Sequence, residues 1–319
     1  MTWLIGAGPM AQAYYKVLQH LEQTPLVIGR SEQSCQNFSE QTGAEVISGG
    51  LELFLKSQPE CARFAIVAVN VVDLYSSCLA LLNYGVKHIL LEKPGALYQW
   101  QLNNLRQLAE QKQATVLIGY NRRFYASVQH ARQQLEQDGG VLSFYFEMTE
   151  WSHQIEATSH PKEVKARWLI ANTAHIIDLA FYLGGTPQQM NSLFTGSLLW
   201  HPSAAVMTGA GVSKSGALFS YQGNWQSAGR WALELSSAQR RFQLMPLEQL
   251  QQQLRGTVVW QPVSLDNDAD HEFKAGLYAQ VKAFLAQDPE HFCDLTTQIQ
   301  RLQWYEQMAN YPDSAKEPI

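Results

Sequence analysis

The sequence predicts an α/β chain of two domains, a doubly wound parallel sheet followed by an α+β domain with an open, mainly antiparallel sheet. Up to about residue 121, short apolar runs alternate with segments of helical period. Beyond that point several segments alternate apolar and polar residues, as antiparallel strands with one covered face do. A length of 319 residues also fits two domains.

The first part of the chain supplies the strands and helices of the parallel sheet. Strands are expected at the apolar runs 3–5, 26–28, 44–47, 64–69, 89–91 and 115–118, of which 44–47 is the weakest. Helices are expected over 9–21, 72–85 and 98–111. Pro9 suits a first helical turn and Gly85 a helix end.

The second part is expected to begin near residues 120–123, which gives domains 1–121 and 122–319. Strands are predicted over 141–151, 216–225, 230–237, 241–247 and 257–265, and helices over 124–137, 173–185, 271–286 and 294–309. The Gln-rich stretch 249–254 is interpreted as the polar surface of a helix or loop.

Composition excludes several classes of protein. A net charge of −5 without a basic stripe argues against nucleic-acid binding. The sequence has no apolar run of the roughly 18–20 residues that a membrane span needs, and it opens on a strand-like run rather than a signal peptide, so a cytoplasmic location is expected. The four cysteines form no C-x-x-C pair and no zinc-like cluster, so we expect reduced thiols and no metal site.

The segment 6-GAGPMA-11 has the pattern of a dinucleotide-binding turn. Gly6 permits a tight turn after the first strand, and Gly8 lets the backbone approach a pyrophosphate at the start of the next helix. Ala11 allows that helix to pack close to the sheet. The alternative interpretation is an ordinary glycine turn.

The segment 26-LVIGRSEQS-34 bears on the choice of cofactor. Gly29 stands where NAD-binding sheets usually carry an acid, and Arg30 and Ser31 follow it. Because a guanidinium and a hydroxyl both bind phosphate well, this pair favours NADP over NAD. The alternative is a solvated arginine at a strand end.

The segment 88-HILLEKPGAL-97 ends a buried strand with Glu92, Lys93 and Pro94. The carboxyl ends of parallel strands face the ligand crevice. A tight Lys93–Pro94 turn, of the kind that cis X-Pro bonds mark, would hold the amine toward that crevice. The alternative is a surface lysine with Glu92 as a casual partner.

The segment 167-RWLIANTAHIIDLAFYLGG-185 places His175 and Asp178 one turn apart on a helix face. A histidine held in one tautomer by an acid can act as a general acid or base. The alternative is a histidine at a helix start that makes a structural bond.

Together these stretches resemble the Gfo/Idh/MocA family of oxidoreductases, named for glucose-fructose oxidoreductase and inositol dehydrogenase. The segments that carry the resemblance are GAGPMA at 6–11, EKPGA at 92–96, GYNRRF at 119–124 and the H-x-x-D helix at 175–178 with Leu183-Gly184-Gly185. The resemblance implies a Rossmann domain and a second domain that often forms oligomer contacts, here a homodimer or homotetramer. It also implies hydride transfer between a nicotinamide and a hydroxyl-bearing carbon of a sugar, cyclitol or nucleotide sugar.

The resemblance further implies that Lys93 lies beside nicotinamide and substrate and that His175 is the acid–base group. The residues expected to bind the cofactor, NADP(H) in preference to NAD(H), are Gly6, Gly8, Pro9, Met10, Arg30, Ser31, Asn70, Glu92 and Lys93. The residues expected to bind a sugar-like substrate are Asn121, Arg123, Trp151, Arg167, Asn172 and Asp178. Trp151 suits stacking on a sugar, and Arg167 suits an acidic group, unless they are a core tryptophan and a solvated base.

One position departs from the family pattern. Many members carry an Asp four residues before the histidine, where this chain has Ala171, followed by Asn172. Asn172 could supply the missing hydrogen bond, or Asp178 could orient His175. The remaining interpretation is a non-catalytic dinucleotide-binding regulator or sensor on the same fold.

Overall fold

The chain folds into two compact units that interleave along the sequence. The computed structural model describes residues 1–317. The first unit contains residues 1–121, 269–299 and the described residues from Ser314 on, and the second contains residues 122–268 and 300–313. The domains expected from the sequence, 1–121 and 122–319, have a single boundary instead.

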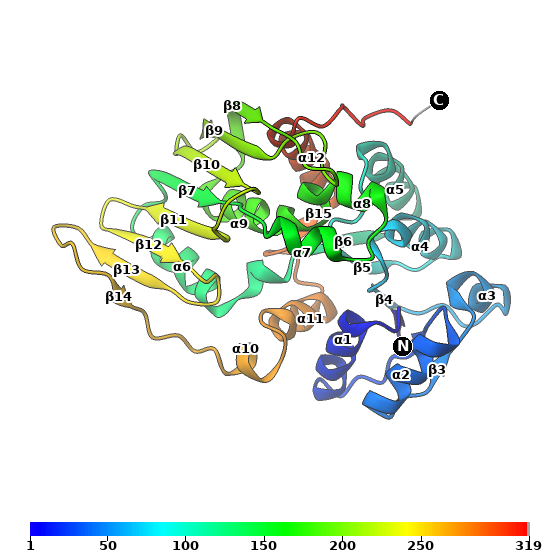
Figure 1. The fold of residues 1–319 in the computed structure, drawn as a ribbon. Coiled ribbons are helices and arrows are strands. Elements are labelled where there is room, and N and C mark those ends of the chain that lie inside the picture. Colours follow the sequence, from blue (N-terminus) through cyan, green and yellow to red (C-terminus); the bar gives the residue numbers. More distant parts are fainter. Residues whose placement is uncertain (318–319) are drawn as a thin grey trace. The chain divides into compact units, whose positions relative to one another are not determined.

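The first unit is built on a seven-stranded sheet in the order β15-β6-β5-β4-β1-β2-β3 (Figure 1). The strands are β1 (Thr2–Ile5), β2 (Leu26–Ile28), β3 (Val46–Ile47), β4 (Phe64–Val67), β5 (His88–Glu92), β6 (Thr115–Gly119) and β15 (Cys293–Asp294). The first six are parallel, and β15 pairs antiparallel with β6. The predicted doubly wound parallel sheet is therefore confirmed.

Helices connect these strands. They are α1 (Pro9–His20), α2 (Glu32–Thr42), α3 (Gly50–Lys56), α4 (Val71–Tyr84), α5 (Gln99–Lys112) and α11 (Leu277–Ala286). The strands β1 and β4 are buried along their whole length, as expected of central strands with helices on both faces. The short helix α10 (Asp268–Glu272) and the turn η1 (Asn121–Phe124) stand at the unit boundaries.

The second unit is built on an eight-stranded sheet in the order β14-β13-β12-β11-β7-β10-β9-β8 (Figure 1). The strands are β7 (Ser143–Glu147), β8 (Pro187–Thr195), β9 (Val206–Ser213), β10 (Leu218–Asn224), β11 (Ala232–Ser236), β12 (Arg240–Leu244), β13 (Gln251–Leu254) and β14 (Gln261–Pro262). All neighbouring pairs are antiparallel except β7 with β10. The predicted open, mainly antiparallel sheet is confirmed.

One face of this second sheet is covered and the other is open. The helices of the unit are α6 (Ala126–Gln137), α7 (Ser152–Ala157), α8 (Lys162–Ala166), η2 (Leu169–Thr173) and α9 (Ala174–Gly184), with the larger part of α12 (Leu295–Ala309). Helix α9 packs on β7 and β11. Phe144 and Phe146 are buried on that side, whereas Tyr145 between them is half-buried.

Three details differ from the prediction. Gln251–Leu254 is strand β13 rather than a helix or loop, and it escaped detection because its glutamines show no apolar alternation. Strands β8 and β9 were not predicted, since β8 buries few of its side chains. Residues 269–299 pack with the first unit because α11 contacts α1 and β15 extends the parallel sheet.

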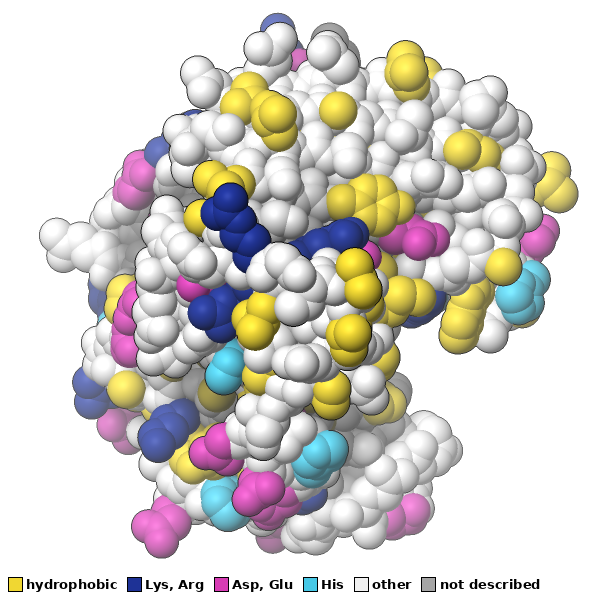
Figure 2. Space-filling view, turned by 90° about the vertical axis from the view of Figure 1, so that its left-hand side faces the viewer, with side chains coloured by type: hydrophobic (Ala, Val, Ile, Leu, Met, Phe, Trp, Pro, Cys, Tyr) yellow, Lys and Arg dark blue, Asp and Glu magenta, His cyan; other side chains and the backbone are white. Residues whose placement is uncertain are grey.

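Two further observations concern the surface. On the face in Figure 2, the described Lys and Arg side chains are interspersed with acidic, hydrophobic and uncharged ones and form no continuous stripe. Within residues 1–317, no helix combines the length and the apolar character that crossing a membrane requires.

Candidate active site

The glycine turn after β1 has the geometry that its sequence predicts. Gly6 has a φ of +121°, and a Cβ there would lie 2.2 Å from the carbonyl oxygen of Ala68, so only glycine fits. Gly8 is the N-cap residue of α1, and a Cβ built on it would have nothing within 4 Å. The space above Gly8 is therefore open to a ligand at the positive end of α1.

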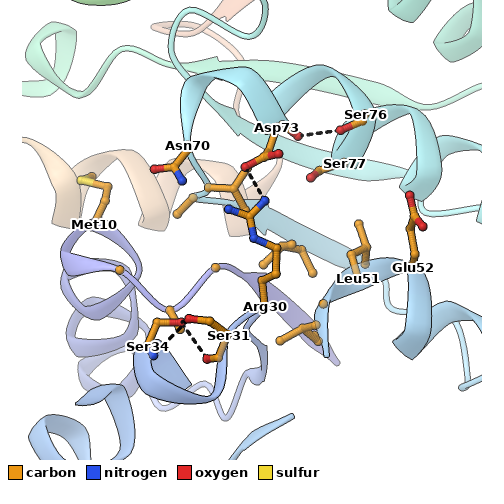
Figure 3. Close-up of a pocket in the computed structure, with 18 of the residues that line it drawn as sticks. Met10, Arg30, Ser31, Ser34, Leu51, Glu52, Asn70, Asp73, Ser76 and Ser77 are labelled. Atoms are coloured by element: carbon orange, nitrogen blue, oxygen red, sulfur yellow. Dashed lines mark hydrogen bonds and ion pairs between the residues drawn. The ribbon is translucent and has the colours of Figure 1, made fainter. Parts of the chain in front are cut away.

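A cavity of about 620 Å³ lies over this turn, within the first unit (Figure 3). Seven of the predicted cofactor-binding residues line it, namely Gly6, Gly8, Pro9, Met10, Arg30, Ser31 and Asn70. Asn70 is the N-cap residue of α4 but makes no capping bond with its side chain, so its amide is available to a ligand. Glu92 and Lys93 are not part of the lining of this cavity.

The end of β2 explains why no acid follows that strand. A Cβ on Gly29 would lie 2.4 Å from the sulfur of Cys35, so a carboxylate cannot stand there. Arg30 instead donates from Nη1 to Oδ2 of Asp73 at 2.9 Å, across the cavity from α4 (Figure 3). The Ser31 hydroxyl accepts from the backbone N–H of Ser34 at 3.3 Å and caps α2. Asp73 would therefore compete with a bound phosphate for Arg30, and nothing in the sequence indicates this pair.

A buried tyrosine hydroxyl contacts Glu92, at the start of the turn after β5. The Lys93–Pro94 bond is cis, and Lys93 is half-buried. The Tyr14 hydroxyl lies 2.6 Å from Oε1 of Glu92 and 3.2 Å from Oε1 of Gln280. Burial raises the pKa of Glu92 above its ordinary value, although the Tyr14 hydrogen bond and the charge of Lys93 oppose that shift. Glu92 therefore anchors the turn that presents Lys93.

His175 lies in the first turn of α9, directly after the π-helical turn η2. The side chain is buried, at 7% exposure, and its ring centroid lies 6.2 Å from that of Trp231. Such π-helical turns are frequent at functional sites.

Asp178 lies in a buried ionic cluster of the second unit. Arg123 donates from Nε and Nη2 to the two carboxylate oxygens at 2.7 Å each, and Arg301 also donates to this carboxylate. Removing one member of such a buried pair leaves an uncompensated charge. The charges of Arg123 and Asp178 are therefore paired within the second unit, and their contact with a substrate stays a prediction.

Two more predicted substrate residues are likewise hydrogen-bonded to other residues of their own unit. Arg167 donates from Nη2 to Oε1 of Glu306 at 2.5 Å, and its guanidinium lies 4.9 Å from the Tyr311 ring. Asn121 donates from its side-chain amide to the carbonyl oxygen of Ala275 at 2.9 Å.

The remaining two predicted substrate residues, Trp151 and Asn172, lie beside Glu150. Oε1 of this buried carboxylate accepts from the Asn172 amide at 3.0 Å and from the Thr173 hydroxyl at 2.7 Å. Oε2 accepts from Arg230 at 2.7 Å. Glu150 thus supplies a carboxylate next to the segment that contains Ala171, from a different part of the chain.

Comparison with known protein families finds a match for the first part of the chain. Residues 2–120 match the sequence profile of the Gfo/Idh/MocA oxidoreductases, described as an oxidoreductase family with a NAD-binding Rossmann fold. The first part of the chain, residues 2–120, therefore has the sequence pattern of the NAD-binding domain of this family. The predicted family resemblance is confirmed.

Solved structures share the fold over nearly the whole chain at low identity. UDP-N-acetylglucosamine 3-dehydrogenase GnnA from Acidithiobacillus ferrooxidans is 15% identical, with 98% of each chain covered and a TM-score of 0.75. Levoglucosan dehydrogenase, in complex with NADH and L-sorbose, is 15% identical, with 98% of this chain and 96% of that one covered and a TM-score of 0.78. A putative NADPH-dependent oxidoreductase from Desulfitobacterium hafniense is 13% identical, with 97% and 94% covered and a TM-score of 0.80.

A curated relative matches a shorter part of the chain. An uncharacterized oxidoreductase of Streptococcus pneumoniae is 21% identical over 189 residues, which are 58% of this chain and 50% of the relative. The match therefore spans about half the length of that relative.

The structure also brings two further arginines close to Trp231, whose ring lies near His175. Arg230 and Arg122 both lie against the Trp231 ring, with their guanidinium carbons 4.6 and 4.8 Å from its centroid. Arg122 adjoins Arg123 in the family motif, and Arg230-Trp231 opens a predicted strand. The sequence does not indicate which of these two adjacent arginines is buried against an acid.

Proposed function

We propose that this chain is an NADP(H)-dependent dehydrogenase or reductase. It would transfer hydride between the nicotinamide and a hydroxyl-bearing carbon of a sugar, cyclitol or nucleotide sugar. The observation that carries the proposal is the open space above Gly8 at the start of α1, inside a cavity of about 620 Å³. The match of residues 2–120 to an oxidoreductase family with a NAD-binding Rossmann fold supports it.

The cofactor fits the residues that are present. The N–H groups at the start of α1 would bind the pyrophosphate, and Asn70 at the start of α4 would add a hydrogen bond. When bound, the nicotinamide supplies the hydride acceptor or donor. The protein binds, orients and handles the proton.

His175 and Lys93 would handle the substrate hydroxyl. Neutral His175 accepts the hydroxyl proton during oxidation and returns it during reduction. Lys93 donates a hydrogen bond to the same oxygen and stabilises the negative charge that develops on it. Tyr14 and Glu92 support this role because they fix the turn from which Lys93 projects.

The preference for NADP(H) rests on the end of β2. Gly29 leaves no room for the acid that would bind a ribose 2′-hydroxyl, and Arg30 remains largely exposed at the cavity. A 2′-phosphate would share the Arg30 guanidinium with Asp73, whose carboxylate offsets part of the attraction.

The class of substrate is supported by the neighbours with the same fold. Their names specify UDP-N-acetylglucosamine in one case and levoglucosan in another. A sugar-like alcohol is therefore the first group of compounds to test.

The Lys93→Ala variant tests the catalytic assignment. With a substrate found by screening sugars, cyclitols and nucleotide sugars, turnover should fall by orders of magnitude. Affinity for NADPH, measured by fluorescence titration, should stay within about threefold, since Lys93 does not line the dinucleotide cavity. An active Lys93→Ala enzyme would contradict the assignment.

A non-catalytic dinucleotide-binding regulator is the second candidate. The feature that favours it is Ala171, a buried residue where many family members have an acid. NADPH binding without hydride transfer to any compound of the screen would support this alternative.

We also expect a homo-oligomer, joined through the open face of the second sheet. A shallow groove on that face is lined by residues of β7, β10, β11 and β12. Leu218 on β10 is 64% exposed there and would be covered by such a contact. Light scattering after size-exclusion chromatography would test this, and Leu218→Glu should shift a dimer or tetramer toward the monomer.

A further inference from the structure

The cluster of the second unit formed by Arg122, Glu150, Trp151, Arg230 and Trp231 has features of a ligand site. Trp231 lies between two guanidinium groups, with the Arg122 carbon 4.8 Å and the Arg230 carbon 4.6 Å from its ring centroid. Arg230 also lies over the Trp151 ring at 4.9 Å. Two cations on one ring repel each other, so this arrangement favours an anion near them.

The two arginines differ in how their charge is compensated. Arg230 donates to the buried carboxylate of Glu150 at 2.7 Å. The Nε of Arg122, in contrast, is buried with no hydrogen-bond partner among residues 1–317. Burial lowers the pKa of the Arg122 guanidinium, and Glu248 and Glu150 offset this only in part. A desolvated guanidinium whose charge is only partly offset is costly unless a ligand adds a negative charge.

The cluster is close to the proposed acid–base residue. The His175 ring centroid lies 6.2 Å from that of Trp231. Glu150 connects the two, since it binds Arg230 on one side and Asn172 and Thr173, just before α9, on the other. Trp231 and Glu150 therefore place an acidic group bound at the arginines in the same side-chain cluster as His175.

Access to the cluster is open. The Arg230 side chain is 42% exposed, and Trp151 is 43% exposed. Trp151 is fixed in place by a hydrogen bond from its Nε1 to the carbonyl oxygen of Gly229 at 3.0 Å. A held, exposed indole beside a guanidinium suits a sugar ring that carries an oxyanion.

We propose that Arg122 and Arg230 bind a carboxylate or phosphate group of the substrate, so that the enzyme acts on an acidic sugar derivative. This inference rests on the proposed function, because it takes His175 as the group that meets the reacting hydroxyl. It assigns the binding of an acidic group to Arg122 and Arg230 in place of Arg123 and Arg167, whose charges are paired with Asp178 and Glu306.

The test measures binding rather than turnover. The full-length protein, saturated with NADPH, is titrated by calorimetry with uronates, sugar 6-phosphates and UDP-sugars, each against its neutral parent sugar. At least one acidic compound should bind about 10-fold to 100-fold more tightly than its neutral counterpart. A preference among uronates identifies a carboxylate as the group bound, and a preference among the other two sets identifies a phosphate.

Two variants locate that preference. Arg230→Gln and Arg122→Gln should each abolish the 10-fold to 100-fold difference, whereas Arg255→Ala, an exposed arginine of the same unit, should keep it. Since Arg230 is partly exposed, its variant should fold even if Arg122→Gln does not. The inference is overturned if no acidic compound binds better than its parent, or if the preference survives in Arg230→Gln.

The outcome is independent of the hydride chemistry. Selective binding of an acidic sugar without its oxidation or reduction would keep the anion site and reject the dehydrogenase. Hydride transfer with a neutral sugar, without preferential binding of any acidic compound, would keep the dehydrogenase and reject the anion site.

Discussion

The glycines at positions 6 and 8 give a prediction in which two neighbouring substitutions have opposite effects. In Gly6→Ala the new Cβ would lie 2.2 Å from the carbonyl oxygen of Ala68, at a φ of +121° that alanine rarely adopts. In Gly8→Ala the Cβ would have nothing within 4 Å, and the backbone, with φ −90° and ψ −178°, is in an ordinary extended conformation. The first change should damage the fold, and the second should leave it intact.

The magnitudes follow from these contacts. Backbone strain and the overlap with a carbonyl should together destabilise Gly6→Ala by about 2–5 kcal/mol. That corresponds to a fall in melting temperature of about 4–20 °C for a domain of this size. Gly8→Ala should change stability by less than about 1 kcal/mol, since it only replaces one N-cap residue. Its methyl group would occupy the space where a pyrophosphate approaches, and NADPH binding should weaken at least about 10-fold.

Two assays on purified protein suffice. Thermal denaturation without nucleotide reports the stability of each variant, and quenching of tryptophan fluorescence by NADPH reports its affinity. If Gly8→Ala binds NADPH as tightly as the unchanged protein, the cavity over α1 is not the dinucleotide site. If Gly6→Ala melts at the unchanged temperature, the close approach of the turn to Ala68 is wrong.

Three other predictions concern charges. Asp178→Asn leaves two buried guanidinium groups without their acid and should destabilise the protein by about 3–5 kcal/mol in urea denaturation. Glu110→Gln, which removes a charge from an exposed ion pair, should cost less than about 0.5 kcal/mol. A stable but inactive Asp178→Asn would instead favour a direct role of Asp178 at His175. Arg30→Ala should weaken NADPH binding about 10-fold to 100-fold and NADH binding less than about threefold in fluorescence titrations, and equal losses would remove the argument for NADP. Burial lowers the pKa of His201 from 6.5 to about 4. Because the unfolded chain takes up this proton first, the contribution of His201 to stability should be constant above pH 6.5 and fall by up to about 3 kcal/mol toward pH 4. Unfolding midpoints measured between pH 7 and 4.5 should show a shallower fall in His201→Gln. An identical fall would show that other groups cause it.

The strands and turns of the first unit could be predicted from sequence because their signals are local. The apolar runs of β1, β4 and β5 are buried on both faces, and Gly6 and Gly8 are specified by one turn. Helices α2 and α3 were not predicted: α2 buries only Cys35 and Phe38, and α3 has only seven residues, too few for an apolar period to distinguish a helix.

The side chains of the second unit were harder to assign because their partners are distant in sequence. Arg123 and Arg167 had the chemistry of substrate ligands, but each meets a buried acid, Asp178 or Glu306, that only the fold brings close. Conversely, Arg122 carries no local sign that its Nε is left without a partner within residues 1–317. Residue type indicates what a side chain can bind, and the long-range pairing decides whether it is still available.

The antiparallel strand β15 has a consequence for dissecting the chain. Cys293–Asp294 covers the outer edge of β6 with backbone hydrogen bonds, although it follows β6 only after the whole sheet of the second unit. A chain cut after residue 121 would keep six parallel strands but expose the N–H and C=O groups of β6. Uncovered strand edges pair readily with other chains, so such a fragment should aggregate. An isolated Rossmann fragment should therefore retain residues 269–299, for example through a linker that replaces the second unit.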